Sequence, residues 1–242
     1  DTYSGIDYLA GSHNNDTFIG GGAQATFQGL EGNNVYNGGS HGLDVVDYSF
    51  DDTFGAAHGV QVNLMLGTGV NAFGGSDTYS QISRVYGTTF ADTLQGGTED
   101  DQFWGLEGND IINGGAGNDA ADYSQDAAYG GLNGVTVDLQ NGTAVDGFGS
   151  IDTLSGIEYV TGTKFADSIT GDGNANILRG LNGADVLNGG GGSDYVDYDW
   201  DQSFGGNSGI VVNLEAGQAT DGFGATDTLG HMENALGSAS SD

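Results

Sequence analysis

Aspartates spaced nine residues apart are the residues of this chain whose type and spacing could bind a cation. Asp92, Asp101, Asp110 and Asp119 lie in consecutive blocks that begin with Gly, namely GTTFADTLQ, GGTEDDQFW, GLEGNDIIN and GGAGNDAAD. The blocks follow the template G-G-x-G-x-D-x-U-x, where U is a large apolar residue. This template is typical of a parallel β-solenoid whose turns are cross-linked by calcium. Calcium prefers carboxylate and carbonyl oxygens, which short Asp side chains and tight turns supply.

The same run occurs twice more in the chain. The third copy places its polar residues at Asp167, Asn176, Asp185 and Asp194, and the degenerate first copy places Asp16, Ala25 and Asn34 in register with Asp44 one residue late. A longer period of about 75 residues is marked by D-T-[YL] triplets, which begin at Asp1, Asp77, Asp152 and Asp227. We therefore expect a tandem array with a degenerate first unit at 1–86, further units at 87–161 and 162–236, and the start of a fourth at 237–242, where Asp242 takes the first ligand position.

The composition points to the same kind of partner. Three Lys or Arg stand against 34 Asp or Glu, for a formal net charge of −31. Such a chain repels nucleic acid and anionic lipid and attracts cations. A disordered acidic tail is disfavoured, because 36% of the residues are hydrophobic and recur in register. Crowded carboxylates repel one another until a cation neutralises them, so we expect a chain that is largely unfolded without calcium and folded with it.

Other features bound the class of protein. The chain has no Cys, so no disulfide can form, and no apolar stretch approaches the length of a membrane span. Its 48 Gly suit successive tight turns with positive φ.

One apolar residue in each block, at position eight, is expected to point inward and form the core. A period of nine residues cannot keep these side chains on one face of a helix, so short strands are predicted. The column reads Phe18, Phe27, Tyr36 and Val46, then Leu94, Phe103, Ile112 and Ala121, then Ile169, Leu178, Leu187 and Val196.

The nonapeptides resemble the RTX repeats of hemolysin-type calcium-binding proteins, most specifically in GLEGNDIINGGAGND at 105–119. The resemblance implies an all-β fold, a parallel β-roll or β-solenoid with calcium-binding turns. It further implies two nonapeptides per coil, so that each turn stacks on the next turn but one. Several calcium ions would then lie between stacked turns, held by Asp carboxylates and backbone carbonyls.

Carried over residue by residue, the resemblance pairs polar positions that are 18 residues apart. The pairs are Asp92 with Asp110, Asp101 with Asp119, Asp167 with Asp185, and Asn176 with Asp194. In the first unit Asp16 would face Asn34, and Ala25 would face Asp44 across an inserted residue. Asn176 offers one neutral oxygen, so its site should be weaker. Glu99 replaces a turn Gly and either strains that turn or adds a ligand. The expected metal-site residues are Asp16, Asp44, Asp92, Asp101, Gly105, Glu107, Gly108, Asp110, Gly115, Gly117, Asp119, Asp167, Asn176, Gly183, Asp185, Gly192 and Asp194.

The segments 48–86, 123–161 and 198–236 depart from the nonapeptide pattern. Alternating apolar residues predict half-buried strands, as at Val135, Val137 and Leu139, while GTAVDGFG predicts a second strand with a turn and IDTLSGIEYV a third. Because 39 residues is close to the length of two larger coils, we expect the solenoid to continue through these segments.

These segments also carry acids of their own. Asp146 to Asp152 and Asp221 to Asp227 form a second acid pattern, either a turn capped by Asp or an additional calcium site. A further column, consisting of Asp51, Asp126 and Asp201, is expected on the solvated surface.

Nothing in the sequence indicates catalysis, and we expect no enzyme activity in this segment. The histidines, which are His13, His41, His58 and His231, do not recur with the repeat and are expected on the surface. There is no HExxH or GxSxG motif. The aromatic residues Tyr48, Tyr123, Tyr198, Trp104 and Trp200 could form a carbohydrate platform, but Tyr residues that follow the last turn of every unit are expected to pack at the end of each roll.

The resemblance implies a calcium-dependent structural repeat region of a secreted bacterial surface protein, such as an adhesin, an S-layer component or an extracellular fibre. Such proteins are exported unfolded by type I secretion from Gram-negative bacteria and fold in extracellular calcium. The alternative is the calcium-binding C-terminal region of a secreted enzyme, such as a protease, lipase or alginate epimerase. Calcium is the expected partner, and copies of the chain, other surface-layer proteins and carbohydrate are further candidates, whereas nucleic acid and a membrane span are not expected.

Overall fold

The computed structural model describes residues 8–40 and 43–237. It forms two compact units, Asp1–Asp119 and Ala120–Asp242, and each is described by itself. The predictions for Asp1, His41 and Asp242 concern positions outside the described residues. The three-unit division made from the 75-residue period stays a prediction, since it follows sequence repeats and not compactness.

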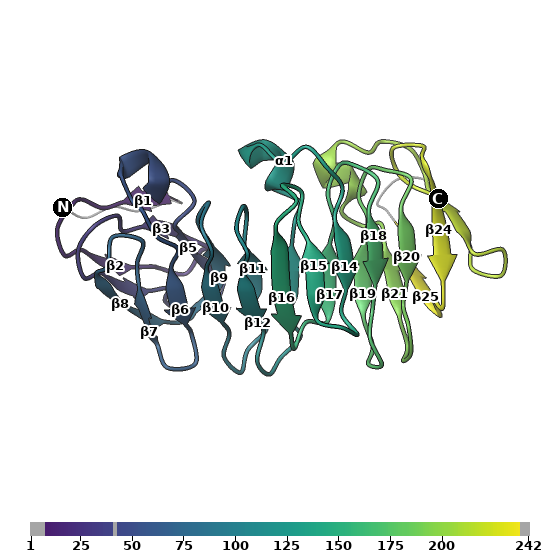
Figure 1. Cartoon of the computed structure of the whole chain (residues 1–242). Coiled ribbons are helices and arrows are strands. Elements are labelled where there is room, and N and C mark those ends of the chain that lie inside the picture. The colour runs from purple at the N-terminus through teal and green to yellow at the C-terminus, as the bar shows by residue number, and fades with distance from the viewer. Residues whose placement is uncertain (1–7, 41–42, 238–242) are drawn as a thin grey trace. The chain divides into compact units, whose positions relative to one another are not determined.

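Strands of successive nonapeptides alternate between two sheets in each unit (Figure 1). In the first unit, one sheet has the order β1 (Tyr8–Ala10), β3 (Thr26–Gln28), β5 (Asp44–Asp47), β9 (Ile82–Tyr86) and β11 (Gln102–Trp104). The other has the order β2 (Thr17–Ile19), β4 (Val35–Asn37), β8 (Ser76–Ser80), β7 (Thr68–Val70), β6 (Gln61–Asn63), β10 (Thr93–Gln95) and β12 (Ile111–Asn113).

The second unit repeats this arrangement. One sheet has the order β13 (Ala120–Asp122), β17 (Tyr159–Thr161), β19 (Ile177–Arg179), β21 (Tyr195–Asp197) and β25 (Asn234–Leu236). The other has the order β16 (Ile151–Ser155), β15 (Thr143–Val145), β14 (Thr136–Asp138), β18 (Ser168–Thr170), β20 (Val186–Asn188), β24 (Thr226–Gly230), β23 (Gln218–Thr220) and β22 (Val211–Asn213).

The strand register confirms that two nonapeptides make one coil. The inward residues of parallel neighbours are 18 positions apart in sequence, as in the pairs Leu94 with Ile112, Ile169 with Leu187, and Leu178 with Val196. In the first unit Phe27 pairs with Val46, which accommodates the residue inserted before Asp44. The prediction that each turn stacks on the next turn but one is therefore correct.

The inward column forms the core, as predicted. All twelve position-eight residues are buried, and eleven of them from Phe27 to Val196 are at most 1% exposed, with Phe18 at 7%. Each strand contributes only one large inward side chain, so the core is a single file of side chains between two sheets. A coil this thin buries little apolar surface, and its stability must depend strongly on what happens in the turns.

The 39-residue segments do not form two larger coils, and that expectation is wrong. In the second unit β14 pairs antiparallel with β15, and β15 pairs antiparallel with β16, while β14 runs parallel to β18. The segment thus adds a three-stranded meander to one sheet and only β17 to the other. The tight turns explain the difference: the chain reverses at Gly142 (φ 65°) and Gly149 (φ 95°), and such short turns can join only antiparallel strands.

The expected strands of these segments are present, and the solenoid continues past them within each unit. β9 lies between β5 and β11, and β17 lies between β13 and β19. The helical elements are single turns, consisting of η1 (Asp51–Phe54), α1 (Asp126–Tyr129) and η2 (Asp201–Phe204). None of the helices in the described ranges has the length or hydropathy that crossing a membrane requires.

Candidate metal-binding turns

A ladder of aspartates runs along each edge of the roll. The backbone N–H of Asp92 donates to Oδ1 of Asp110 (2.8 Å), and that of Asp101 donates to Oδ1 of Asp119 (2.7 Å). The third copy repeats the contact, from Asp167 to Asp185 and from Asn176 to Asp194, both at 2.8 Å. The four predicted pairs therefore face one another in adjacent coils.

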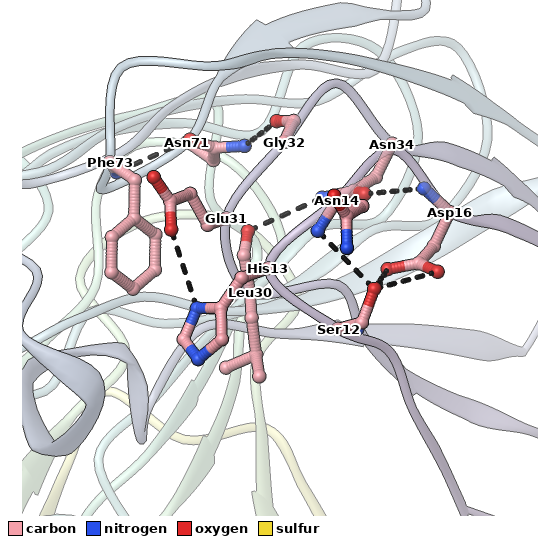
Figure 2. Close-up of polar contacts among 10 residues, drawn as sticks. All are labelled: Ser12, His13, Asn14, Asp16, Leu30, Glu31, Gly32, Asn34, Asn71 and Phe73. Carbon is pink, nitrogen blue, oxygen red and sulfur yellow. Dashed lines mark hydrogen bonds and ion pairs between the residues drawn. The ribbon is translucent and has the colours of Figure 1, made fainter.

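The first copy keeps this ladder with fewer charges (Figure 2). The N–H of Asp16 donates to Oδ1 of Asn34 (3.0 Å), and the N–H of Ala25 donates to Oδ1 of Asp44 (2.7 Å). The backbone N–H of Ser12 donates to Oδ2 of Asp16 (2.7 Å). Each of these two rungs has one carboxylate, whereas every later rung except Asn176 with Asp194 has two, so the first copy provides less charge for a cation.

The ladder also includes acids that sequence reasoning missed. Asn34 N–H donates to Oδ1 of Asp77 (2.8 Å), and Asp185 N–H donates to Oδ1 of Asp227 (2.9 Å). Glu233 continues the other edge by accepting the N–H of Asp194 at 2.9 Å. The D-T-[YL] triplets that mark the 75-residue period contain Asp77 and Asp227, and this recurrence is the sequence signal that could have identified them. Their Asp residues continue the nonapeptide column beyond the nonapeptides.

Some carboxylate oxygens in the ladder are buried without a hydrogen-bond donor. Oδ2 of Asp185 and Oδ2 of Asp194 are both in this state, and each residue is 1% exposed. Leaving a buried charged oxygen unpaired costs several kcal/mol unless a proton or a cation compensates it. These oxygens therefore fit the requirement of a bound cation.

The first Asp of a run is different, because the protein already satisfies its oxygens. Oδ1 of Asp92 accepts the N–H of Val60 (2.6 Å) and the hydroxyl of Thr88 (2.9 Å), and Oδ2 accepts the N–H of Thr88 (2.7 Å). Asp167 has the same three contacts, from Val135 and Thr163. These two residues cap their turns as well as belonging to the predicted site.

Glycine allows the turns to approach the carbonyls beneath them. A Cβ added at Gly108, Gly117, Gly183 or Gly192 would lie 2.4–2.6 Å from the carbonyl oxygen of the residue 18 positions earlier. A Cβ at Gly105 would lie 2.4 Å from Oδ2 of Asp110. Close stacking therefore places carbonyl oxygens and carboxylates at the same edge, and it explains why these positions need Gly. Gly115 takes φ 103° in the same turns.

The Glu99 question is partly resolved. Glu99 is exposed and is absent from the non-Gly residues with positive φ in the described chain, so the turn is not strained by it. The carbonyl oxygen of Glu99 would lie 2.5 Å from a Cβ at Gly117, so the two turns stack as closely here as at the other turns. Glu107 is also exposed.

Carbonyls must supply much of any coordination sphere. Within residues 8–40 and 43–237, no three side chains of His, Asp or Glu form a group that could hold a metal by themselves. Calcium takes six to eight oxygens and accepts backbone carbonyls readily. A site of two facing carboxylates completed by turn carbonyls is thus within its range.

Burial makes these acids poor anions in the absence of a cation. Burial, with a contribution from the charges of Asp167 and Asp227, raises the pKa of Asp185 to about 8. Burial raises the pKa of Asp101 to about 7, with a contribution from the charge of Asp119. A divalent cation would reverse this effect by favouring the ionised form.

The expectation that Asp51, Asp126 and Asp201 lie on the solvated surface is wrong. All three are at most 1% exposed. Each begins a single helical turn, and the loops at Gly147 and Gly222 donate hydrogen bonds to Asp126 and Asp201. Burial raises the pKa of both Asp51 and Asp126 to about 8, and neighbouring carboxylates add to the effect.

The second acid pattern does cap a turn. Oδ1 of Asp146 accepts the N–H groups of Phe148 (2.9 Å) and Ser150 (2.7 Å), and Oδ1 of Asp221 accepts those of Phe223 (3.0 Å) and Ala225 (2.7 Å). Capping uses only one oxygen of each carboxylate, so the same residues could also belong to an additional calcium site.

The recurrence of Tyr at the same position in each of the three repeats is explained by packing. Tyr48, Tyr123 and Tyr198 are at most 1% exposed, and their hydroxyls donate to Oδ2 of Asp77, Asp152 and Asp227 at 2.9, 3.1 and 2.8 Å. They cannot form a carbohydrate platform. Trp104 is also buried, whereas Trp200 is 37% exposed. His13, His58 and His231 are exposed, as expected.

Comparison with known proteins gives two findings. Residues 86–120, 152–182 and 170–204 match the model of the RTX calcium-binding nonapeptide repeat, in four copies. Among solved structures, the extracellular lipase LipA from Serratia marcescens matches at 16% identity with a TM-score of 0.20. That match covers 95% of this chain and 38% of the lipase chain, so the chain spans well under half the length of the lipase.

Proposed function

Since the chain carries RTX calcium-binding nonapeptide repeats, we propose that it is a calcium-dependent structural repeat region of a secreted bacterial surface protein, such as an adhesin, an S-layer component or an extracellular fibre. The observation that carries the proposal is the repetition of the aspartate ladder in both compact units. The acids serve to connect one coil to the next, and they are not gathered around one cleft.

Calcium in these turns would act as a structural cross-link. Asp185 presents an oxygen with no donor, and its N–H is tied to Asp227 in the next coil. Neutralising these carboxylates removes the repulsion that otherwise opposes stacking. Because the thin core supplies little stability by itself, folding and ion binding become one event.

This coupling suits export. A chain with a net charge of −31 and 48 Gly resists compaction when calcium is scarce. Such a chain could pass a type I secretion channel of a Gram-negative bacterium unfolded and then fold in the calcium outside the cell. We propose no catalytic role for the segment.

The alternative function is the calcium-binding C-terminal region of a secreted enzyme, such as a protease, lipase or alginate epimerase. In that case catalysis would belong to another part of the protein. Copies of the chain or surface-layer proteins are partners only under the first function. Carbohydrate stays a proposed partner, but Tyr48, Tyr123 and Tyr198 are buried and would not contact it.

Antibodies raised against this segment would separate the two functions in the source bacterium. A surface protein predicts staining of intact, unpermeabilised cells that disappears after the surface layer is stripped. A freely released enzyme predicts the antigen in the culture medium together with hydrolase or epimerase activity that the antibodies co-precipitate, and this result would contradict the surface function.

Replacing Asp185 by Asn should lower the number of bound calcium ions. The change removes the charge and the donor-free Oδ2, while the amide oxygen can still accept the N–H of Asp167. We expect about one calcium ion fewer per chain near physiological calcium, measured by equilibrium dialysis.

Asp138→Asn is the matched control for Asp185→Asn. It makes the same charge change in a surface turn, where Asp138 caps Asn141 (2.9 Å) and the equivalent Asn213 and Asn63 cap their turns in the other repeats. Equal calcium binding by Asp185→Asn and Asp138→Asn would contradict the role given to Asp185.

A further inference from the structure

A second pair of buried acids lies outside the nonapeptide turns. Asp201 is the first residue of η2, and Asp221 opens the turn between β23 and β24. Both side chains are 0% exposed. The pair recurs one repeat earlier as Asp126, at the start of α1, and Asp146, between β15 and β16.

Hydrogen bonds hold the two loops of this pair against each other. Gly222 N–H donates to Oδ2 of Asp201 at 2.8 Å, and Ser208 N–H donates to the carbonyl of Gly222 at 2.9 Å. A Cβ at Gly222 would lie 2.8 Å from Cβ of Asp201, so the contact requires Gly. The earlier copy has the same bond, from Gly147 to Oδ2 of Asp126 at 2.9 Å.

Each acid of the pair keeps one buried oxygen without a donor. These atoms are Oδ1 of Asp201 and Oδ2 of Asp221, and the earlier copy repeats the first of them as Oδ1 of Asp126. The second oxygen of each acid already accepts backbone N–H groups of the loops. The donor-free oxygens are therefore additional to the oxygens that stabilise the turns. The charge of Asp221 acts on Asp201, whose pKa is raised to about 7 by burial first and then by this and other carboxylates.

Asp201 and Asp221 form no ion pair with a basic side chain among the residues that the structure describes. The ion pairs there involve His13 and Arg179, and Arg179 contacts Asp197 and Asp199. Two neighbouring buried carboxylates with donor-free oxygens and no basic partner require either a cation or a proton.

The first repeat shows how the chain removes such a site. Asn71 and Ala72 replace the acid and the Gly. Asn71 still caps its turn, through Oδ1 to the N–H groups of Phe73 (3.2 Å) and Gly75 (2.8 Å). Its Nδ2 donates to the carbonyl of Gly32 (2.7 Å; Figure 2) and to Oδ1 of Asp77 (3.0 Å). The first repeat therefore lacks the second carboxylate of the pair, although both oxygens of Asp51, the equivalent of Asp201, are buried without a donor there.

We propose that Asp201 with Asp221, and Asp126 with Asp146, form a second class of calcium site, separate from the nonapeptide turns and absent from the first repeat. Backbone carbonyls complete the coordination, because a group of three acidic or histidine side chains is not present in the described residues. The site ties the helical turn at the end of each roll to the meander, and it gives the 39-residue segments a calcium dependence of their own.

Calcium counting in the whole chain tests this site, with Asp221→Asn as the variant. Asn71 shows that Asn can cap this turn, so the backbone should be retained, and circular dichroism in calcium checks that it is. Equilibrium dialysis against calcium alone should show one ion fewer per chain for Asp221→Asn, one fewer for Asp146→Asn and two fewer for the double variant. Asp138→Asn, which makes the same charge change in a surface turn, should bind as many ions as the wild type.

The outcomes separate this inference from the proposed function. If Asp185→Asn loses an ion and both Asp221→Asn and Asp146→Asn bind as many as the wild type, the second class of site is wrong and the acids share a proton instead. If Asp221→Asn does not fold, Asp146→Asn and Asp201→Asn give the same count independently, and unchanged binding by either overturns the proposal. If the wild type binds no calcium, the proposed function itself fails.

Discussion

Calcium-free protein is expected to become more stable as the pH falls from about 8 to about 5.5, which is the reverse of ordinary acid denaturation. Burial raises the pKa of Asp126 and Asp185 to about 8 and that of Asp201 to about 7, from the ordinary value of 3.8. The folded state therefore binds protons more tightly than the unfolded state. Stability from these groups is complete below about pH 4 and is lost as the pH rises through about 8.

The expected effect is large because many carboxylates share it. Each unit of raised pKa corresponds to about 1.4 kcal/mol between the two protonation states. Protons should thus partly replace calcium, since both neutralise the same crowded acids. Far-UV circular dichroism in calcium-depleted buffer should show the fraction of folded protein falling steadily from about pH 5.5 to about pH 8.

The useful pH window stays above the isoelectric point, which is about 4.1, to avoid precipitation. In saturating calcium the slope should flatten or reverse, because the bound ion favours the ionised carboxylates. Metal-free protein that gains stability as the pH rises would show that these acids are not crowded in the folded state.

Arg179→Met should destabilise the second unit by about 3–5 kcal/mol even in saturating calcium. Arg179 is 7% exposed, pairs with buried Asp197, donates to the hydroxyl of Thr161 (3.2 Å) and lies 4.0 Å from the ring centre of Trp200. Removing the guanidinium leaves the charge of Asp197 buried and uncompensated. Chemical unfolding in calcium, monitored by Trp fluorescence, measures the loss.

Two further variants show whether the charge is responsible. Arg179→Met with Asp197→Asn should recover part of the lost stability, because it removes the uncompensated charge. Arg84→Met is the control in β9, where the side chain is only half-buried, and it should cost under about 1 kcal/mol. A loss below about 1 kcal/mol for Arg179→Met would mean that Asp197 finds another partner.

The nonapeptide coil could be predicted because its information is local. Each block supplies its own turn, its own acid and one inward residue, so Leu94 and Ile112 must stack once two blocks complete a coil. The pairing of Asp92 with Asp110 follows from the same period.

The meander could not be predicted from its alternating residues. Val137 is buried in β14 whether its neighbour runs parallel or antiparallel, so alternation alone does not give the direction of the next strand. The turns at Gly142 and Gly149 decide it, and they are short motifs with several possible conformations.

The buried acid column was mispredicted for a general reason. Asp is mostly exposed in proteins, so Asp126 and Asp201 were placed on the surface. Their burial depends on loops that return from 21 residues further along the chain, as the hydrogen bond from Gly222 N–H to Asp201 shows. Asp227 joined the ladder through a contact 42 residues distant, which the nine-residue period does not contain.

Far-UV circular dichroism during a calcium titration, with magnesium as the control, tests calcium-coupled folding most directly. Near neutral pH we expect the calcium-free chain to lack most of its β-signal, to gain it cooperatively as calcium is added, and to lose it again in excess EGTA. Magnesium should have little effect, because it demands a stricter octahedral geometry and dehydrates reluctantly. Full β-structure that persists unchanged in excess EGTA near neutral pH would contradict the cross-linking role of calcium.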